Sequence, residues 1–140
     1  MRRRHKARRW VLQILYAWEV RDRPGRLAEE AAGFFERRRI GVDTRGFAEE
    51  LIAVLDAHLD EIDRILGESA ENWDPARMSI IDRNVLRIGL AELLHLPDVP
   101  FKVSIDEAVT LARRYGGADS PRFVNGVLDA AAHRLDLIPS

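Results

Sequence analysis

The sequence contains no cysteine and no long hydrophobic run. Without cysteine the chain forms no disulfide bond, no thiolate metal site and no cysteine nucleophile. No apolar stretch approaches the ~18 residues that a membrane-spanning helix needs. The basic start followed by residues 10–18 imitates a signal peptide, but that run contains Gln13 and ends at Trp18-Glu19 without a small-residue cleavage site. We therefore expect a cytoplasmic protein.

Lysine is nearly absent as well, because 20 of the 22 basic residues are arginine. The formal net charge of −1 conceals a strong asymmetry. Residues 1–9 hold six basic side chains and no acid: Arg2, Arg3, Arg4, Lys6, Arg8 and Arg9. Removing these six from the 22 leaves 16 basic against 23 acidic residues, a net charge of −7 for the remainder. An electropositive start thus precedes an acidic body, and arginine suits contacts with phosphate.

The length of 140 residues, with 46% hydrophobic and 32% charged residues, is typical of one globular domain, taken here as residues 1–140. Between the prolines, hydrophobic residues recur with the 3.6-residue period of α-helices. The expected helices cover about 3–21, 26–39, 44–67, 79–96, 104–116 and 120–135. The fourth is apolar on nearly every side, which predicts the buried centre of a helical bundle.

Local signals set several of these boundaries. Thr44 is a candidate N-cap, and Gly67 suits a helix end. The stretch Ser104-Ile105-Asp106-Glu107 reads as a capping box, and Pro100 favours an extended connector before it. Ser120 and Pro121 fit the cap and first turn of the last helix. The period continues through Asn125-Gly126, so we expect Gly126 to be a close-packing position inside that helix.

Signals for catalysis or metal binding are sparse. The four histidines fall into no zinc or triad spacing, and there is no glycine-rich phosphate loop. Glu92 and His95 match the Glu-x-x-His element of di-iron bundles, but no other histidine has an acid three residues before it. We therefore expect no metal, no cofactor and no enzymatic activity.

The N-terminal helix carries a more informative pattern. At 100° per residue, His5, Arg9, Gln13 and Tyr16 share one face, opposite the face of Trp10, Ile14 and Trp18. Arginine beside an amide and an exposed aromatic ring can grip phosphates and stack an unpaired base, as RNA-binding proteins do. The alternative is a frayed basic terminus with Tyr16 packed on a neighbouring helix. Duplex DNA would more naturally require a helix-turn-helix, and none is evident.

A series of short stretches, in order and spacing, resembles the NusB family of bacterial transcription antitermination factors over essentially the whole length. The matching stretches are Arg8–Tyr16, Asn72-Trp73, Asp82–Arg87, Glu92–Leu94, Asp98–Pro100, Glu107–Ala112, Tyr115-Gly116 and Phe123–Asp129. The resemblance implies a compact all-α bundle of about six to seven helices in two packed halves, without catalytic activity. It implies binding of boxA-type ribosomal RNA leaders with NusE, a small-subunit ribosomal protein. The wider partner is the RNA polymerase elongation complex with other Nus factors.

The resemblance places RNA contacts at Arg8, Arg9 and Tyr16, and beside them at Asp82 and Arg83. There Asp82 can accept hydrogen bonds from a base edge while Arg83 holds phosphate. With the charge pattern, the predicted RNA-binding set is Arg2, Arg3, Arg4, Lys6, Arg8, Arg9, Gln13, Tyr16, Asp82 and Arg83. Asp119 and Phe123 match the contact with the ribosomal protein. Phe123 also shares the helical phase of the core, so a core role is the alternative.

Two other functions remain open at the level of sequence. One is a helical protein-interaction module without an RNA role, since bundles host many functions. The other is an accessory domain like the one that precedes certain ribosomal RNA methyltransferase domains, for which 140 residues leave no catalytic room. The sequence also leaves open whether the free protein is a monomer or a homodimer. It departs from the family pattern at Ala91 and in the basic run Arg37–Arg39, whose role is undetermined.

Overall fold

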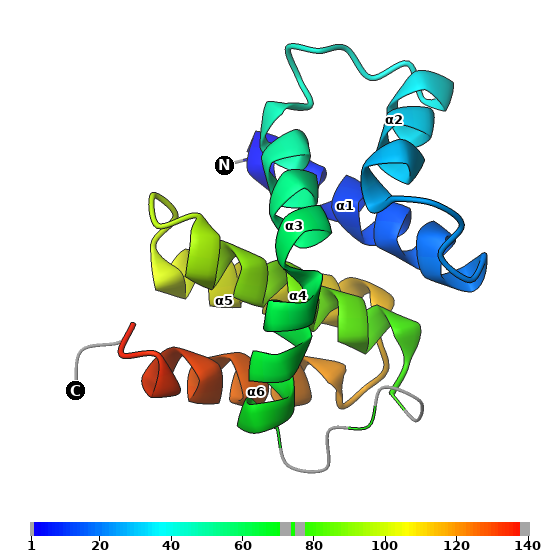
Figure 1. Cartoon of the computed structure of the whole chain (residues 1–140). Coiled ribbons are helices and arrows are strands. Elements are labelled where there is room, and N and C mark those ends of the chain that lie inside the picture. The colour runs from blue at the N-terminus through cyan, green and yellow to red at the C-terminus, as the bar shows by residue number, and fades with distance from the viewer. Residues whose placement is uncertain (1, 71–73, 75–77, 138–140) are drawn as a thin grey trace.

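The computed structural model of the chain describes residues 2–70, 74 and 78–137, with backbone alone at Arg2 (Figure 1). These residues form six α-helices and no β-strand, which confirms the expected all-α class. The helices are α1 (Arg2–Val20), α2 (Leu27–Arg37), α3 (Gly46–Ser69), α4 (Ile80–His95), α5 (Phe101–Tyr115) and α6 (Ser120–Arg134). The matching pair Asn72-Trp73 lies outside the described residues. None of the described helices is long and apolar enough to cross a membrane.

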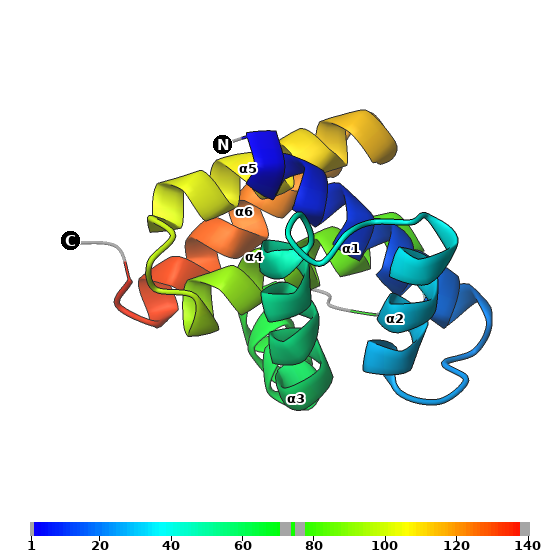
Figure 2. The ribbon, with the colours of Figure 1, turned by 90° about the horizontal axis from the view of Figure 1, so that it is seen from above.

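The helices form two packed halves that meet along α3 and α4. In Figure 1, α1, α2 and the beginning of α3 lie above, while α4, α5 and α6 lie below. Figure 2 shows α5 and α6 side by side, with α4 between them and the first half. Helix α4 packs against α1, α3, α5 and α6, and every residue from Asn84 to Leu93 is buried. The predicted central position of this helix is therefore confirmed.

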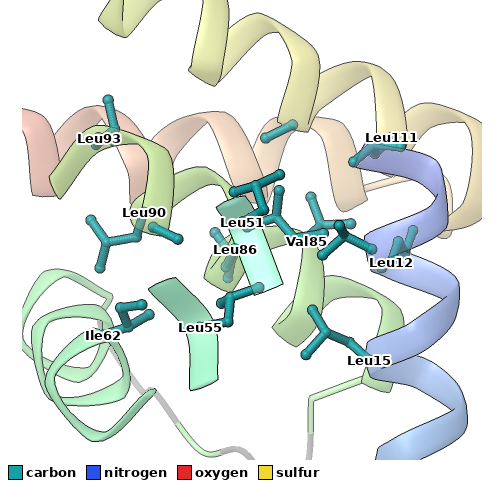
Figure 3. Packing of buried hydrophobic residues seen from close by; sticks show 14 of the residues in the cluster. Leu12, Leu15, Leu51, Leu55, Ile62, Val85, Leu86, Leu90, Leu93 and Leu111 are labelled. Carbon is teal, nitrogen blue, oxygen red and sulfur yellow. The ribbon is translucent and has the colours of Figure 1, made fainter. Parts of the chain in front are cut away.

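The core is built from aliphatic side chains of several helices. Figure 3 shows Leu12 and Leu15 of α1 facing residues of α3, α4 and α5. The labelled partners are Leu51, Leu55, Ile62, Val85, Leu86, Leu90, Leu93 and Leu111. Burying each such side chain contributes roughly 1.5–3 kcal/mol. This shared core holds the N-terminal helix firmly against the rest of the molecule.

Two glycines in helices behave differently. A Cβ atom at Gly89 would lie 2.6 Å from Leu128, so α4 and α6 pack closely there. At Gly126 a Cβ atom would meet nothing within 4 Å, and the residue is exposed. The expected close packing at Gly126 is therefore wrong, although the residue does lie inside α6.

The expected boundaries of three helices also need correction. Helix α5 begins at Phe101 rather than at a box around Ser104, because Pro100 can precede a helix without needing an N–H partner. The Thr44 hydroxyl donates to the carbonyl of Gly41 and closes a turn, so α3 begins at Gly46 and runs past Gly67. Ser120 is the first residue of α6, not its cap, and its hydroxyl accepts from the Gly117 N–H.

Candidate nucleic-acid interface

The first turns of α1 present a cluster of exposed cations. Arg3, Arg4 and Lys6 are exposed, whereas the side chain of Arg2 lies outside the described residues. The Arg4 guanidinium lies 4.8 Å from the ring centroid of Phe47, and the Lys6 ammonium 5.6 Å from that of Trp10. Cation–π contacts of this kind orient the side chains while leaving their charge accessible.

The middle of α1 carries the face that the helical projection predicts. His5 Nδ1 lies 2.7 Å from Glu107, and Arg9 Nε donates to the Tyr115 hydroxyl over 3.1 Å. Gln13 is partly exposed, and 45% of the Tyr16 surface is accessible. Tyr16 is one of the few large hydrophobic residues exposed in the described chain. Tyr16 is therefore not a fully buried core residue, although part of its ring is covered by its neighbours, and its role in RNA binding stays a prediction.

Beside this face lies a groove of about 470 Å³ between α1, α2, the start of α4 and the end of α5. Its apolar lining consists of Leu12, Ala17, Phe34 and Ile81, and its polar and aromatic lining of Gln13, Tyr16, Arg37, Arg38 and Tyr115. Arg38 donates to Gln13 Oε1 over 3.1 Å and lies over the ring of Phe34. An apolar floor with aromatic and amide edges is the kind of surface that receives an unstacked nucleobase.

A second hollow of about 320 Å³ continues the basic surface between α1 and the loop after α2. Arg3, Lys6 and Arg39 contribute to its lining. The run Arg37–Arg39, whose role the sequence leaves undetermined, therefore borders both depressions. Together the two hollows form a cationic path along one side of α1.

Arg8 is not part of this path, which corrects its prediction as an RNA contact. Its side chain is 2% exposed, and its guanidinium donates two hydrogen bonds of 2.7 Å to the Glu92 carboxylate. Ser104 donates a further bond to the same carboxylate. The Arg8 guanidinium is thus paired with both oxygens of the Glu92 carboxylate, and this buried ion pair holds α1 onto α4 and α5. Arg8 therefore offers no hydrogen-bond donor to a ligand at the surface.

Arg83 lies in a second internal network at the start of α4. It donates to Glu19 over 2.9 Å, and Arg87, which is buried, also bonds to Glu19 and holds Asp63 through two bonds of 2.8 and 2.9 Å. Burial alone would raise the pKa of the Glu19 carboxyl, but the hydrogen bond from Arg83 and the charges of Arg87 and Arg83 outweigh it, so the pKa is lowered. A phosphate contact by Arg83 stays a prediction, and it would have to share this guanidinium with Glu19.

Asp82 lies next to Ile81 of the groove. Its backbone N–H donates to the hydroxyl of Ser79, which caps α4. The Oδ1 atom of Asp82 is buried and has no hydrogen-bond partner among the described residues. That atom is not accessible from outside, so the contact of Asp82 with RNA stays a prediction.

The predicted partner contact lies where α5 passes into α6. Asp119 is exposed just before α6, four residues after Tyr115 of the groove. Phe123 is half-buried and packs against the core with part of its ring. The core role of Phe123 therefore holds in part, and its contact with the ribosomal protein stays a prediction.

Sequence reasoning missed the groove residues Phe34 and Tyr115. Each lies near a helix end, and only the packing of α2 and α5 around α1 brings them to Tyr16. The burial of Arg8, by contrast, could have been predicted from its position on the helix. Arg8 shares the helical phase of Leu12 and Leu15, both of which are buried.

Comparison with known proteins covers this surface from His5 onward. The model of the NusB family matches residues 5–133. The transcription antitermination protein NusB of Thermodesulfovibrio yellowstonii is 39% identical over 138 residues, which cover 93% of this chain and 91% of that protein. Both α1 from His5 onward and the complete α4 fall inside the matched range.

Solved structures give the same result at the level of the fold. T. maritima NusB superposes with a TM-score of 0.84 and 34% identity, covering 93% of this chain and 90% of that one. A crystal structure of the antitermination factors NusB and NusE in complex with dsRNA contains a chain with a TM-score of 0.83 and 30% identity. That alignment covers 96% of this chain and 98% of the other.

Proposed function

The chain belongs to the NusB family, and from this we propose that it is a transcription antitermination factor. In this proposal it binds an RNA of the boxA type together with the small-subunit ribosomal protein NusE. A structural relative that was crystallised with NusE and dsRNA supports the pairing of these two partners. The observation that carries the proposal for this chain is the groove beside the exposed Tyr16.

The groove can receive an unpaired base of the RNA. We propose that the Tyr16 ring stacks on the base, because stacking on an exposed aromatic tolerates any base and needs no partner strand. Gln13 offers an amide to the base edge, and Arg38, which already bonds to Gln13, stabilises a nearby phosphate. Asp82 accepts a further hydrogen bond from the RNA at the start of α4.

The cationic path along α1 then holds the RNA backbone. Arg3 and Lys6 line this path, and Arg9 bonds to Tyr115 of the groove. Arg4 lies outside the two hollows, over Phe47 of α3, but it is exposed and adds its charge to the same end of α1. Arg2 belongs to the same set on its sequence position alone. Such contacts contribute affinity without reading sequence, and they weaken as salt rises.

NusE is proposed to bind at the start of α6, through Asp119 and the exposed part of Phe123. Because Tyr115 of the groove lies only four residues before Asp119, RNA and protein partner would occupy adjoining surfaces. Adjoining surfaces allow one ligand to contact the other, so each is expected to strengthen the binding of the other by the same factor.

The remaining assignments follow from this role. Residues 1–140 act as one domain that binds its partners and carries out no catalytic step. The protein works in the cytoplasm, where a bacterial transcript emerges from RNA polymerase. There the bound RNA and NusE would join the elongation complex with other Nus factors.

The experiment is fluorescence anisotropy with a labelled boxA-type RNA, with and without NusE. We expect tighter binding when NusE is present and a loss of about tenfold, or roughly 1.4 kcal/mol, in Arg38→Ala. The matched control is Arg64→Ala, which removes an exposed arginine of α3 that pairs with Glu68. Equal RNA binding by both variants would show that the groove is not part of the RNA site. If the unmodified chain bound no RNA, the alternative function as a protein-interaction module would be favoured.

A further inference from the structure

The far end of α4 holds a cluster of metal-ligating side chains that the RNA surface does not use. His95 is the last residue of α4, and His58 and Glu61 lie in α3. Glu92, the acid that precedes His95 by three residues, bonds instead to Arg8. The partners of His95 therefore come from another helix, which no sequence spacing reveals.

The three side chains converge on one carboxylate oxygen. His95 Nε2 lies 2.8 Å from Oε1 of Glu61, and His58 Nδ1 lies 3.7 Å from the same atom. The two imidazole rings stack, with centroids 3.9 Å apart and planes inclined by 16°, so one ring has to rotate about its side-chain bonds before both can point a nitrogen at one ion. One potential ligand atom from each residue lies within 4.8 Å of the others. Two nitrogens and one oxygen thus lie close enough for side-chain rotations to bring them around one ion.

The backbone of α3 is interrupted at this point. His58 has φ −125° and ψ 19°, which are not helical values, and a kink divides the helix there. The kink puts the first ligand at a break in α3, with Glu61 in the turn that follows. Because His95 closes α4, the cluster joins the second half of α3 to the end of the central helix.

The chemistry of these donors favours a borderline divalent ion. Zn²⁺ takes imidazole nitrogen at about 2.0–2.1 Å and carboxylate oxygen at about 2.0–2.2 Å, which places donors roughly 3.3 Å apart in a tetrahedron. The observed nitrogen–oxygen distances of 2.8 and 3.7 Å lie on either side of that value. Mg²⁺ and Ca²⁺ prefer oxygen ligands and do not suit two imidazoles.

We propose that His58, Glu61 and His95 bind one Zn²⁺ ion, with water in the fourth position. The ion ties the kinked half of α3 to the C-terminal end of α4. Thirteen residues of α4, or about 20 Å of helix, separate His95 from Asp82, so the metal site is distinct from the proposed RNA groove. Zinc binding therefore does not depend on the proposed function.

The test is a titration of the tag-free, RNA-free protein with Zn²⁺ in competition with a chromophoric chelator. We expect one ion per chain, and no displacement of it by excess Mg²⁺. His58→Ala, His95→Ala and Glu61→Gln should each weaken Zn²⁺ binding by at least about 10–100-fold. Loss of a residue that only hydrogen-bonds to a metal ligand already costs that much, and loss of a ligand itself should cost no less. Circular dichroism of each variant verifies that the helices remain folded.

The matched control is His133→Ala, which removes an exposed histidine of α6. It should bind Zn²⁺ within about twofold of the unmodified chain, and RNA affinity should be unchanged in folded His95→Ala. Substoichiometric binding by the unmodified chain would overturn the proposal. Full binding by His58→Ala and His95→Ala, or an equal loss in His133→Ala, would overturn it as well, since either outcome describes adventitious surface histidines.

Discussion

Replacing Tyr16 by alanine separates a role in binding from a role in folding. The ring lines the groove and keeps 45% of its surface accessible, so about half of it contributes to packing. Removing a fully buried aromatic side chain costs about 3–5 kcal/mol of folding free energy. Because only about half of the Tyr16 ring is buried, we expect its removal to cost no more than about 2 kcal/mol. Lost stacking on a base costs about 1–3 kcal/mol of binding free energy.

In Tyr16→Ala we therefore expect the Kd for boxA-type RNA to rise by about 5–150-fold, while the protein stays folded. The assay combines fluorescence anisotropy for RNA with urea unfolding on the same preparation. Tyr16→Phe is the matched control, because it keeps the ring and should bind RNA almost as the unmodified chain does. A loss of stability above about 3 kcal/mol, with unchanged RNA affinity in the folded fraction, would refute the assignment of this face.

Other residues give predictions of a different kind. Arg8→Ala leaves the Glu92 carboxylate buried without its cation, so urea unfolding should show a loss of about 3–5 kcal/mol in the free energy of unfolding. The double variant Arg8→Met/Glu92→Leu should recover most of that loss, and a mild effect of the single change would mean that the ion pair is hydrated. The lowered pKa of Glu19 means that its carboxylate stabilises the fold above its unfolded pKa of 4.5 and that this contribution is lost as the pH falls through the lower folded value. Thermal unfolding of Glu19→Gln should accordingly depend less on pH below about 4.5 than that of the unmodified chain, and parallel curves would show that the ion pairs with Arg83 and Arg87 contribute little. Asp119→Lys should weaken the binding of NusE more than the binding of RNA in parallel titrations, because reversing an exposed charge at the rim of a protein interface mainly affects association with that partner. Unchanged NusE binding would place that contact elsewhere.

The helices could be predicted from the sequence because each carries its own periodic apolar face. The central α4 is the clearest case, since a helix that is apolar on nearly every side has to be surrounded. The start of α5 could not be predicted in this way. Ser104 and Glu107 have the spacing of a capping box, yet the Ser104 hydroxyl donates to Glu92 of α4, a tertiary contact that local spacing does not encode.

The site was predictable to the extent that it lies on one helix. The face of Arg9, Gln13 and Tyr16 follows from helical geometry alone; in the structure Tyr16 is exposed, whereas Arg9 and Gln13 are partly buried. Arg8 looks like one more cation of the basic run because its partner Glu92 is 84 residues away. The groove itself needs four helices, and Arg38 and Tyr115 reach it only through their packing.

The claim that RNA occupies the groove beside α1 is tested most directly by photo-cross-linking. A boxA-type RNA with a photoreactive base is irradiated in complex with the protein and NusE, and the attached peptide is identified by mass spectrometry. The account predicts attachment within residues 13–16 of α1, reduced in Tyr16→Ala but retained in Arg64→Ala. Attachment confined to α3, or unchanged by loss of Tyr16, would contradict it.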